Sequence, residues 1–209
     1  MNARMILVAG SFGTLLASPA FAEDTSGSTS ATTSKMRAEA QFELLPLGSG
    51  KTSVGDGSVS QDTAVAYGIT GTFDYAVTPY ISVGVAPRIV FNVISDDATD
   101  GVKSGRELDL RARVLGHYPV SPGVELYGSL SPGYTILMSG EDGVDNATGF
   151  AIGGAAGVTY DLSPKMFIGG EVGYQRAFTS SDMTVAGQTF SADLDLSYLH
   201  IGIGAGTRF

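Results

Sequence analysis

Cysteine is absent from the 209 residues of this chain, and lysine occurs only four times, at positions 35, 51, 103 and 165. The absence of cysteine excludes disulfide bonds and thiolate metal sites. The net charge is −9, without the basic clusters that nucleic-acid binding requires, so no nucleic-acid partner is expected. No run of the sequence approaches the roughly 18 apolar residues that a membrane-spanning helix needs.

The first 35 residues have the layout of an export signal. Arg4 is the only charge before the apolar stretch 5–17, and small residues follow up to Ala22. This pattern predicts a secretory signal peptide over residues 1–22, cleaved after Ala22. Residues 23–35 are rich in Ser and Thr and have little to bury, so we predict a flexible leader there.

From residue 36 onward, apolar residues alternate with polar or small residues in one repeated pattern. Alternation with a period of two predicts strands that have two different faces. Eight such segments occur, at residues 36–47, 62–77, 80–94, 106–120, 124–138, 148–160, 165–179 and 194–209. We therefore interpret residues 36–209 as a single all-β domain.

The connections between these segments alternate strictly between short and long. Three tight turns contain proline, at residues 77–79, 120–123 and 162–165. Four longer polar connections lie at residues 48–61, 95–105, 139–147 and 180–193. The order predicts an eight-stranded antiparallel up-and-down barrel with unequal ends, and this asymmetry is typical of transmembrane barrels with short periplasmic turns and longer external loops.

Alternation alone does not distinguish a membrane barrel from a soluble one, which would carry its apolar face inside. In segment 106–120 the polar face carries Glu107, Asp109, Arg111 and Arg113, and the four lysines lie only in predicted loops or at strand ends. Long charged residues mixed with glycine suit the narrow interior of an eight-stranded barrel. We therefore place the apolar face against lipid, and a secreted, soluble, lipocalin-like ligand-binding barrel is the alternative.

The polar face predicts a network of charged side chains in the lumen. Because buried charges must be paired, we expect salt bridges that plug the barrel, and a narrow ion path is the alternative. The predicted network contains Arg37, Glu39, Glu43, Arg88, Glu107, Asp109, Arg111, Arg113, Glu125, Glu171 and Arg208, together with His117, His200 and Gln175.

Aromatic residues of the apolar face fall at two levels. Four lie toward the short turns, Tyr75, Tyr118, Tyr160 and Phe209, and five lie higher, Phe42, Phe91, Tyr134, Phe150 and Tyr174. Two belts of interfacial aromatic residues are typical of membrane barrels.

Four residues fit this pattern less well. Arg176 and Asp195 share the parity of the apolar face, and we expect both near the outer rim, where lipid headgroups tolerate charge. Pro87 and Pro132 lie within predicted strands and cannot donate to a ladder, so we predict β-bulges there.

The chain ends on Phe209, with Ala205, Ile203 and Ile201 at alternate positions before it. This ending resembles the C-terminal signal that the barrel-assembly machinery reads in bacterial outer-membrane proteins. Over residues 36–209 the chain resembles the small eight-stranded outer-membrane barrels, the class of the OmpA barrel domain and OmpX. The resemblance implies an outer-membrane location, contacts with lipid and lipopolysaccharide, assembly through Phe209, and a monomer.

We expect no enzyme activity, no cofactor and no metal site. The chain has two histidines; Ser197 has the opposite parity to His200, and no serine is predicted beside His117. The acidic loops lack the spacing of a calcium-binding loop. A structural or surface-interaction role is therefore the leading hypothesis, and a narrow pore or transport of a small solute or hydrophobic compound is the alternative.

Overall fold

The structure is a computed structural model that describes residues 34–93, 104–139, 145–185 and 188–209. The predicted signal peptide and all but the last two residues of the leader lie outside the described residues, as do most of the predicted connections 95–105 and 139–147. Within the described ranges, no helix has the length and hydrophobicity to span a membrane.

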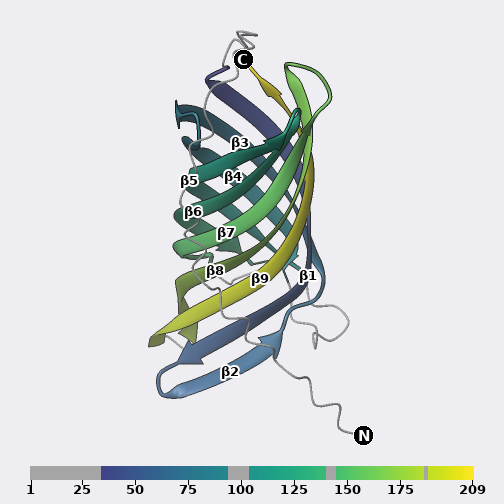
Figure 1. Cartoon of the computed structure of the whole chain (residues 1–209). Coiled ribbons are helices and arrows are strands. Elements are labelled where there is room, and N and C mark those ends of the chain that lie inside the picture. The colour runs from purple at the N-terminus through teal and green to yellow at the C-terminus, as the bar shows by residue number, and fades with distance from the viewer. Residues whose placement is uncertain (1–33, 94–103, 140–144, 186–187) are drawn as a thin grey trace, which may run out of the picture. The chain divides into compact units, whose positions relative to one another are not determined.

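Nine antiparallel strands form one sheet that closes on itself (Figure 1). They are β1 (Met36–Val54), β2 (Gly57–Asp62), β3 (Ala66–Thr78), β4 (Ile81–Val93), β5 (Gly105–Ser121), β6 (Val124–Met138), β7 (Ala147–Asp161), β8 (Met166–Val185) and β9 (Gln188–Arg208). Each strand from β3 to β8 pairs with the next, and β1 pairs with both β3 and β9. The short strand β2 pairs with the part of β1 that extends beyond β3. The predicted eight-stranded antiparallel barrel is confirmed.

The short turns and both ends of the barrel domain lie at one end, which we call the short-turn end. Here the backbone N–H groups of Met36 and Phe209 each donate to the carbonyl oxygen of the other, at 3.0 Å. The last residue of the chain therefore closes the barrel against its first strand.

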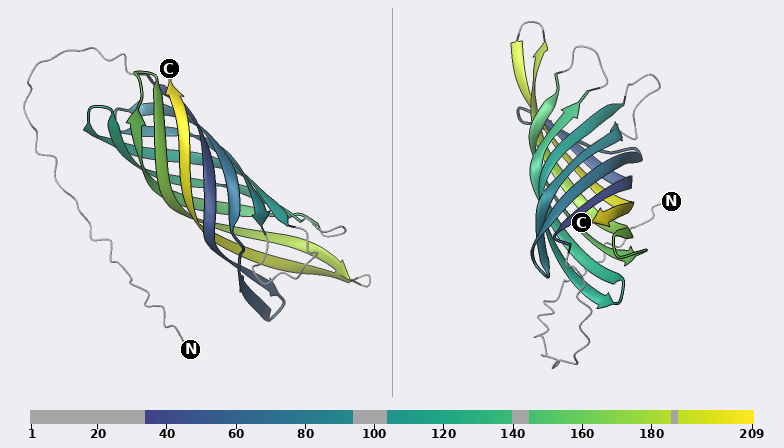
Figure 2. Two further views of the ribbon diagram at one scale, coloured as in Figure 1. Left: turned by 90° about the vertical axis from the view of Figure 1, so that its right-hand side faces the viewer. Right: turned by 90° about the horizontal axis from the view of Figure 1, so that it is seen from above.

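The opposite end, which we call the long-loop end, differs from the sequence-based prediction. Residues 48–61 and 180–193, both predicted as loops, belong largely to strands, and Lys51 lies within β1 rather than in a loop. The predicted segment 62–77 begins too early, because Asp62 ends β2. The β1–β2 and β8–β9 hairpins project past the other strands in Figure 2. Backbone pairing continues through both hairpins, where residues 48–61 and 180–193 lack the regular apolar alternation of the barrel strands, so the sequence pattern did not indicate them.

The prediction of bulges at Pro87 and Pro132 is wrong. The β3–β4 ladder pairs Thr70 with Arg88 and resumes with Phe73 and Val85 in the same register. The β5–β6 ladder has a similar interruption opposite Pro132, again without a shift of register. Each proline therefore interrupts the ladder on one side without changing which side chains face the lumen.

Register shifts occur elsewhere. The β1–β9 ladder shifts between Leu44 and Leu47, around Pro46. The β4–β5 ladder shifts beside Asn92, whose φ of 64° lies in the left-handed region that asparagine tolerates. The Asn92 side-chain amide donates to the Val65 carbonyl oxygen at 2.8 Å, which stabilises this conformation.

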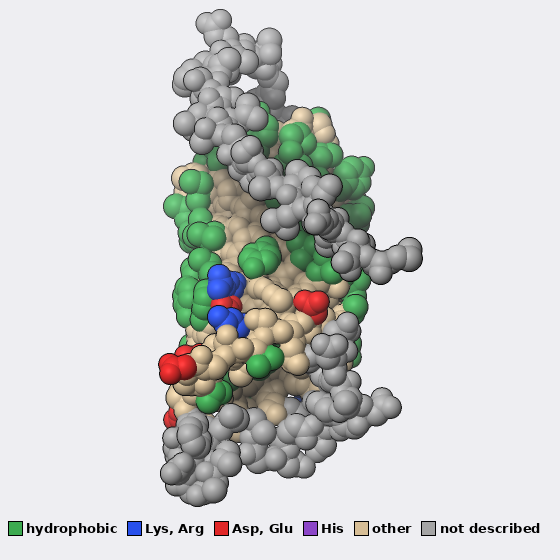
Figure 3. Space-filling model, turned by 90° about the horizontal axis from the view of Figure 1, so that it is seen from below, with side chains coloured by type: hydrophobic (Ala, Val, Ile, Leu, Met, Phe, Trp, Pro, Cys, Tyr) green, Lys and Arg blue, Asp and Glu red, His purple; other side chains and the backbone are tan. Residues whose placement is uncertain are grey.

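The barrel has an apolar outside and a charged inside. The outward residues of the strands are mainly large and apolar, and they are exposed in the isolated chain, as in Ile81, Val83 and Val85 of β4. On the face seen in Figure 3, hydrophobic side chains lie mostly along the two sides of the described surface, and the charged side chains lie in its lower half. This distribution is the inverse of that in a soluble barrel.

Candidate functional site in the barrel interior

All eleven residues of the predicted charge network face the lumen. Eight of them are buried, whereas Glu125, Glu171 and Arg208 are half-buried. They come from β1, β4, β5, β6, β8 and β9, and the closed wall brings them together across the lumen. The strand period of two explains this placement, because residues of one parity all point to one side of the wall.

Arg88 is the centre of the network. Its side chain is fully buried, and its Nε donates to Glu43 Oε2 at 2.7 Å. Its Nη1 lies 2.5 Å from Gln175 Oε1, 3.3 Å from Asp109 Oδ2 and 3.5 Å from Glu107 Oε1. One guanidinium thus joins acidic side chains from β1 and β5 with the amide of Gln175 on β8.

Arg111 and Thr70 complete this middle layer. Arg111 Nη1 donates to Gln175 Oε1 at 3.0 Å, and its Nε lies 3.8 Å from Asp109 Oδ2. The Thr70 hydroxyl donates to Glu43 Oε1, so both oxygens of Glu43 are held. Charge-assisted bonds of this kind fix the side chains in one arrangement.

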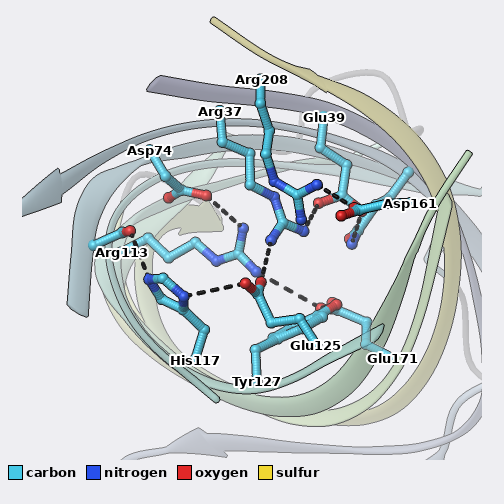
Figure 4. A network of polar contacts seen from close by, with 12 residues as sticks. Arg37, Glu39, Asp74, Arg113, His117, Glu125, Tyr127, Asp161, Glu171 and Arg208 are labelled. Carbon is cyan, nitrogen blue, oxygen red and sulfur yellow. Dashed lines mark hydrogen bonds and ion pairs between the residues drawn. The ribbon is translucent and has the colours of Figure 1, made fainter. Parts of the chain in front are cut away.

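Nearer the short-turn end, Arg37 joins opposite walls of the lumen, as Figure 4 shows. Its Nη2 donates to Glu39 Oε2 at 2.7 Å, and its Nη1 lies 3.4 Å from Glu125 Oε1. The Arg37 guanidinium carbon also lies 4.2 Å from the centre of the Phe167 ring. The side chain therefore crosses the lumen and leaves little room for a water-filled channel.

Glu171 is the second centre of the network. The Tyr127 hydroxyl donates to Glu171 Oε2 at 2.7 Å, and His200 Nε2 lies 3.3 Å from Glu171 Oε1. Arg113 Nη2 lies 3.8 Å from Glu171 Oε2, while Arg113 Nη1 donates to Asp74 Oδ2 at 3.2 Å.

The prediction that no serine lies beside His117 is wrong. Ser82 Oγ lies 3.2 Å from His117 Nε2, and Glu125 Oε2 lies 3.3 Å from His117 Nδ1. This is the contact order of a serine-hydrolase triad. Ser82 lies on β4 between β3 and β5 and is only 6% exposed, so its hydroxyl is largely screened from solvent.

Ser197, by contrast, lies on the outer face as its parity predicts. Its hydroxyl oxygen is 2.9 Å from that of Ser49 on the neighbouring strand. It therefore points away from His200, which follows three residues later in the sequence and faces the lumen.

Three members of the network were missed by the sequence analysis. Asp74 pairs with Arg113, Asp161 accepts a hydrogen bond from Arg208, and Tyr127 binds Glu171. Their parity places each of them inside the barrel. Both aspartates are charged residues at inward-facing positions of their strands, so the alternation of the sequence was sufficient to identify them.

The described lumen residues include more carboxyl groups than guanidinium groups. Eight carboxylates take part in the ion pairs, Glu39, Glu43, Asp74, Glu107, Asp109, Glu125, Asp161 and Glu171. Five guanidinium groups face them, Arg37, Arg88, Arg111, Arg113 and Arg208. Three carboxylates therefore depend on histidine, protons or cations for compensation.

An apolar layer lies between this network and the long-loop end. Leu45 and Ala66 form the last pair of the β1–β3 ladder, and both are fully buried. Val90, Leu196 and Tyr198 pack in the same cluster. The sequence analysis did not predict this layer, because it assigned the apolar residues to the lipid face.

Above the apolar layer, residues of β1, β2, β4, β6 and β9 line a partly open cavity of about 170 Å³. Val59, Val93, Leu137, Leu194 and Leu196 line it, together with polar residues that include Asp62 and Gln61. It is therefore a mainly apolar depression with a polar rim at the long-loop end.

The outer surface carries the aromatic residues expected there. Tyr75, Tyr118, Tyr160, Phe209, Phe42, Tyr134, Phe150 and Tyr174 are exposed, and Phe91 is half-buried where it stacks on Tyr67.

Arg176 and Asp195 also lie on the outer surface, where they form a salt bridge between β8 and β9. Arg176 Nε lies 2.9 Å from Asp195 Oδ1. Lys51 is the register partner of Asp195 on β1. Pairing allows these charges to share the parity of the apolar face.

A closed eight-stranded barrel with a lipid-compatible outside and a charged lumen defines an integral β-barrel membrane protein. The chain belongs to the outer membrane protein beta-barrel domain family, whose sequence model matches residues 11–209. It is therefore a protein of the bacterial outer membrane, and the alternative of a soluble lipocalin-like barrel is set aside. No curated protein sequence matches the chain.

Solved structures of outer-membrane proteins share the fold at low sequence identity. The outer membrane protein OprG from Pseudomonas aeruginosa is 14% identical, with a TM-score of 0.62, and the match covers 84% of this chain and 96% of OprG. The outer membrane protein AlkL is 16% identical, with a TM-score of 0.55, and the match covers 90% of this chain and 97% of AlkL. Neisserial surface protein A is 12% identical, with a TM-score of 0.51 and coverage of 82% and 97%.

Proposed function

We propose that the protein is a non-conducting outer-membrane barrel that acts at the cell surface through its long-loop end. The observation that carries this proposal is the double closure of the lumen. Side chains of Arg37, Arg88 and Arg113 cross the interior to carboxylates on other strands, and the layer around Leu45 and Tyr198 covers them. An eight-stranded barrel has no space for a channel beside such side chains.

Planar-bilayer recording of the refolded barrel tests this proposal. We expect no discrete conductance steps from wild-type protein whose folding has been verified by its heat-dependent migration on a gel. Discrete steps that change with Arg111→Ala or Glu171→Ala would contradict the proposal and favour a gated narrow pore through the charge network.

The cavity at the long-loop end supports a second candidate, the binding of a small hydrophobic compound during its uptake. Leu194 and Leu196 line this cavity, and the charged network below would block an apolar solute from the lumen. Such a compound would have to leave sideways through the wall. A fluorescent apolar probe should bind wild-type protein and lose affinity with Leu194→Asp; equal binding by both would exclude this site.

We also propose the partners that the resemblance implies. Phe209 is 53% exposed at the short-turn end, where the barrel-assembly machinery would bind it during insertion. Its ring lies 6.2 Å from that of Phe73, within the lower aromatic belt. Lipid and lipopolysaccharide would surround the outer surface, and the protein would be a monomer. If Phe209 is part of the assembly signal, Phe209→Ala should be recovered from the outer membrane in smaller amounts than the control Phe73→Ala. Equal recovery of the two variants would contradict this role.

A further inference from the structure

Three potential metal ligands converge on the inner face of adjacent strands. Glu43 of β1 and Glu171 of β8 are both register partners of Gly202 of β9, one from each side. His200 lies two residues before Gly202 on the same face of β9. One ligand atom from each of the three side chains lies within 4.8 Å of the other two.

Two glycines make room for this arrangement. A Cβ atom at Gly202 would come within 3.2 Å of Glu171 Cγ, and a Cβ atom at Gly173 would come within 2.4 Å of the His200 ring. The His200 ring therefore lies over Gly173. The three side chains border a cavity of about 20 Å³, which is large enough for one water molecule or one ion.

The second nitrogen of the His200 ring supports a ligand role independently. His200 is 95% buried, because its exposed fraction is 5%, and its Nδ1 has no hydrogen-bond partner among the described residues. A buried polar atom without a partner costs free energy unless something binds it. His200 also lines the 20 Å³ cavity.

Neighbouring side chains hold the two carboxylates in place. Thr70 and Arg88 bind Glu43, and the Tyr127 hydroxyl donates to Glu171 Oε2. Glu171 Oε1 is left facing His200. Hydrogen bonds from surrounding residues orient metal ligands in this way in many proteins.

Charge also favours a cation, since the described lumen holds eight carboxylates and five guanidinium groups. A divalent ion would offset two of the three carboxyl groups that have no guanidinium counterpart. Arg111 and Arg113 border the same cavity, so an ion must bind close to the carboxylates to outweigh their repulsion.

From this geometry we propose that Glu43, Glu171 and His200 bind one divalent transition-metal ion, of which Zn²⁺ is the representative. One imidazole and two carboxylates suit Zn²⁺ with a water as fourth ligand, at bonds of about 2.0–2.2 Å. The side chains need to move inward only by about 1 Å to reach those distances. The ion would join β8, β9 and β1, and so strengthen the seam between the first and last strands.

Zinc retention by the refolded barrel tests the proposal. The mature chain is refolded in detergent with ZnCl₂, free ion is removed with a chelator, and bound zinc is counted by mass spectrometry. We expect about one ion per barrel for wild type, and less than about a tenth of that for His200→Gln and Glu171→Gln. A folded wild-type barrel that retains no zinc overturns the proposal and assigns the surplus charge to protons.

The matched control is His117→Gln. His117 faces Glu125 at 3.3 Å, as His200 faces Glu171, but it is not part of the three-residue cluster. His117→Gln should retain as much zinc as wild type does. Equal loss of bound zinc in His117→Gln and His200→Gln would contradict the assignment of the ion to the Glu43, Glu171 and His200 cluster.

Folding of every variant is verified by heat-dependent migration. If His200→Gln does not fold, wild type refolded with Co²⁺ decides the question. Strong visible absorption of four-coordinate cobalt is expected, and the weak spectrum of hydrated six-coordinate cobalt would contradict the proposal.

Discussion

The lumen contains two layers that fill the barrel by different means. The charged layer around Arg88 depends on pairing, because each guanidinium there holds carboxylates that would otherwise be buried alone. The apolar layer around Leu45, Val90 and Leu196 depends on contact between side chains that need no partner. In the charged layer, removal of one partner leaves a buried charge unpaired and should strongly lower the free energy of unfolding. In the apolar layer, the loss of stability should grow with the side-chain volume that is removed.

Removal of the central guanidinium should have the largest effect. Arg88→Met leaves Glu43, Glu107 and Asp109 without their shared cation, and should lower the free energy of unfolding by about 3–5 kcal/mol. Denaturant unfolding in detergent, followed by circular dichroism, measures the change. Arg88→Lys, which keeps the charge without the planar fork, should lose less; a loss below about 1 kcal/mol for Arg88→Met would contradict the pairing argument.

Truncation in the apolar layer should have the next largest effect. Leu196→Ala creates a cavity between packed side chains and should cost about 2–4 kcal/mol in the same measurement. The control is Leu110→Ala on the outer surface, where detergent or lipid fills the space and the loss should be under about 1 kcal/mol. Equal losses would show that the inner layer is not tightly packed.

The hydroxyl of Tyr198 should contribute little, although the residue is buried. This oxygen makes no hydrogen bond of normal length and angle among the described residues, although the Glu107 carboxyl group lies near it. Tyr198→Phe keeps the ring in the apolar layer and should change the free energy of unfolding by less than about 1 kcal/mol, with an increase as the favoured direction. If the free energy of unfolding decreased by about 2 kcal/mol or more, the Tyr198 hydroxyl would have to form a hydrogen bond with the charged layer.

The smallest effect is expected outside the lumen. Arg176 and Asp195 form an exposed pair, so Arg176→Ala should leave the free energy of unfolding almost unchanged. Measurement at low and high salt checks the reason, since added salt should reduce even a small loss. A loss comparable with that of Arg88→Met would contradict the distinction between inner and outer ion pairs.

Strand periodicity was sufficient to place the eleven charged residues of the predicted network in the lumen. Arg37, Glu107 and Arg111 could be placed inside because alternation assigns every second residue of a strand to one face. The sequence was also sufficient for the number of barrel strands and their order, since the short and long connections alternate. Both properties depend only on local pattern and chain connectivity.

Register between strands could not be predicted in this way. Glu43, Glu171 and His200 meet because their strands are aligned on Gly202, and that alignment depends on the whole closed ladder. The bulge near Pro46 shifts one of these ladders, whereas Pro87 shifts none. A proline shows that a donor is missing, but the surrounding backbone decides whether the strand bulges.

The pairing of β1 with β9 has a consequence for the rate of folding. These strands come from opposite ends of the domain, yet their ladder is among the longest in the barrel. Closing so large a loop requires a large loss of chain entropy before any of its hydrogen bonds form. Neighbouring hairpins can assemble early, but closure must wait until the first strand finds the last. A catalyst that holds these two edges together would therefore accelerate the slowest step without changing the final structure.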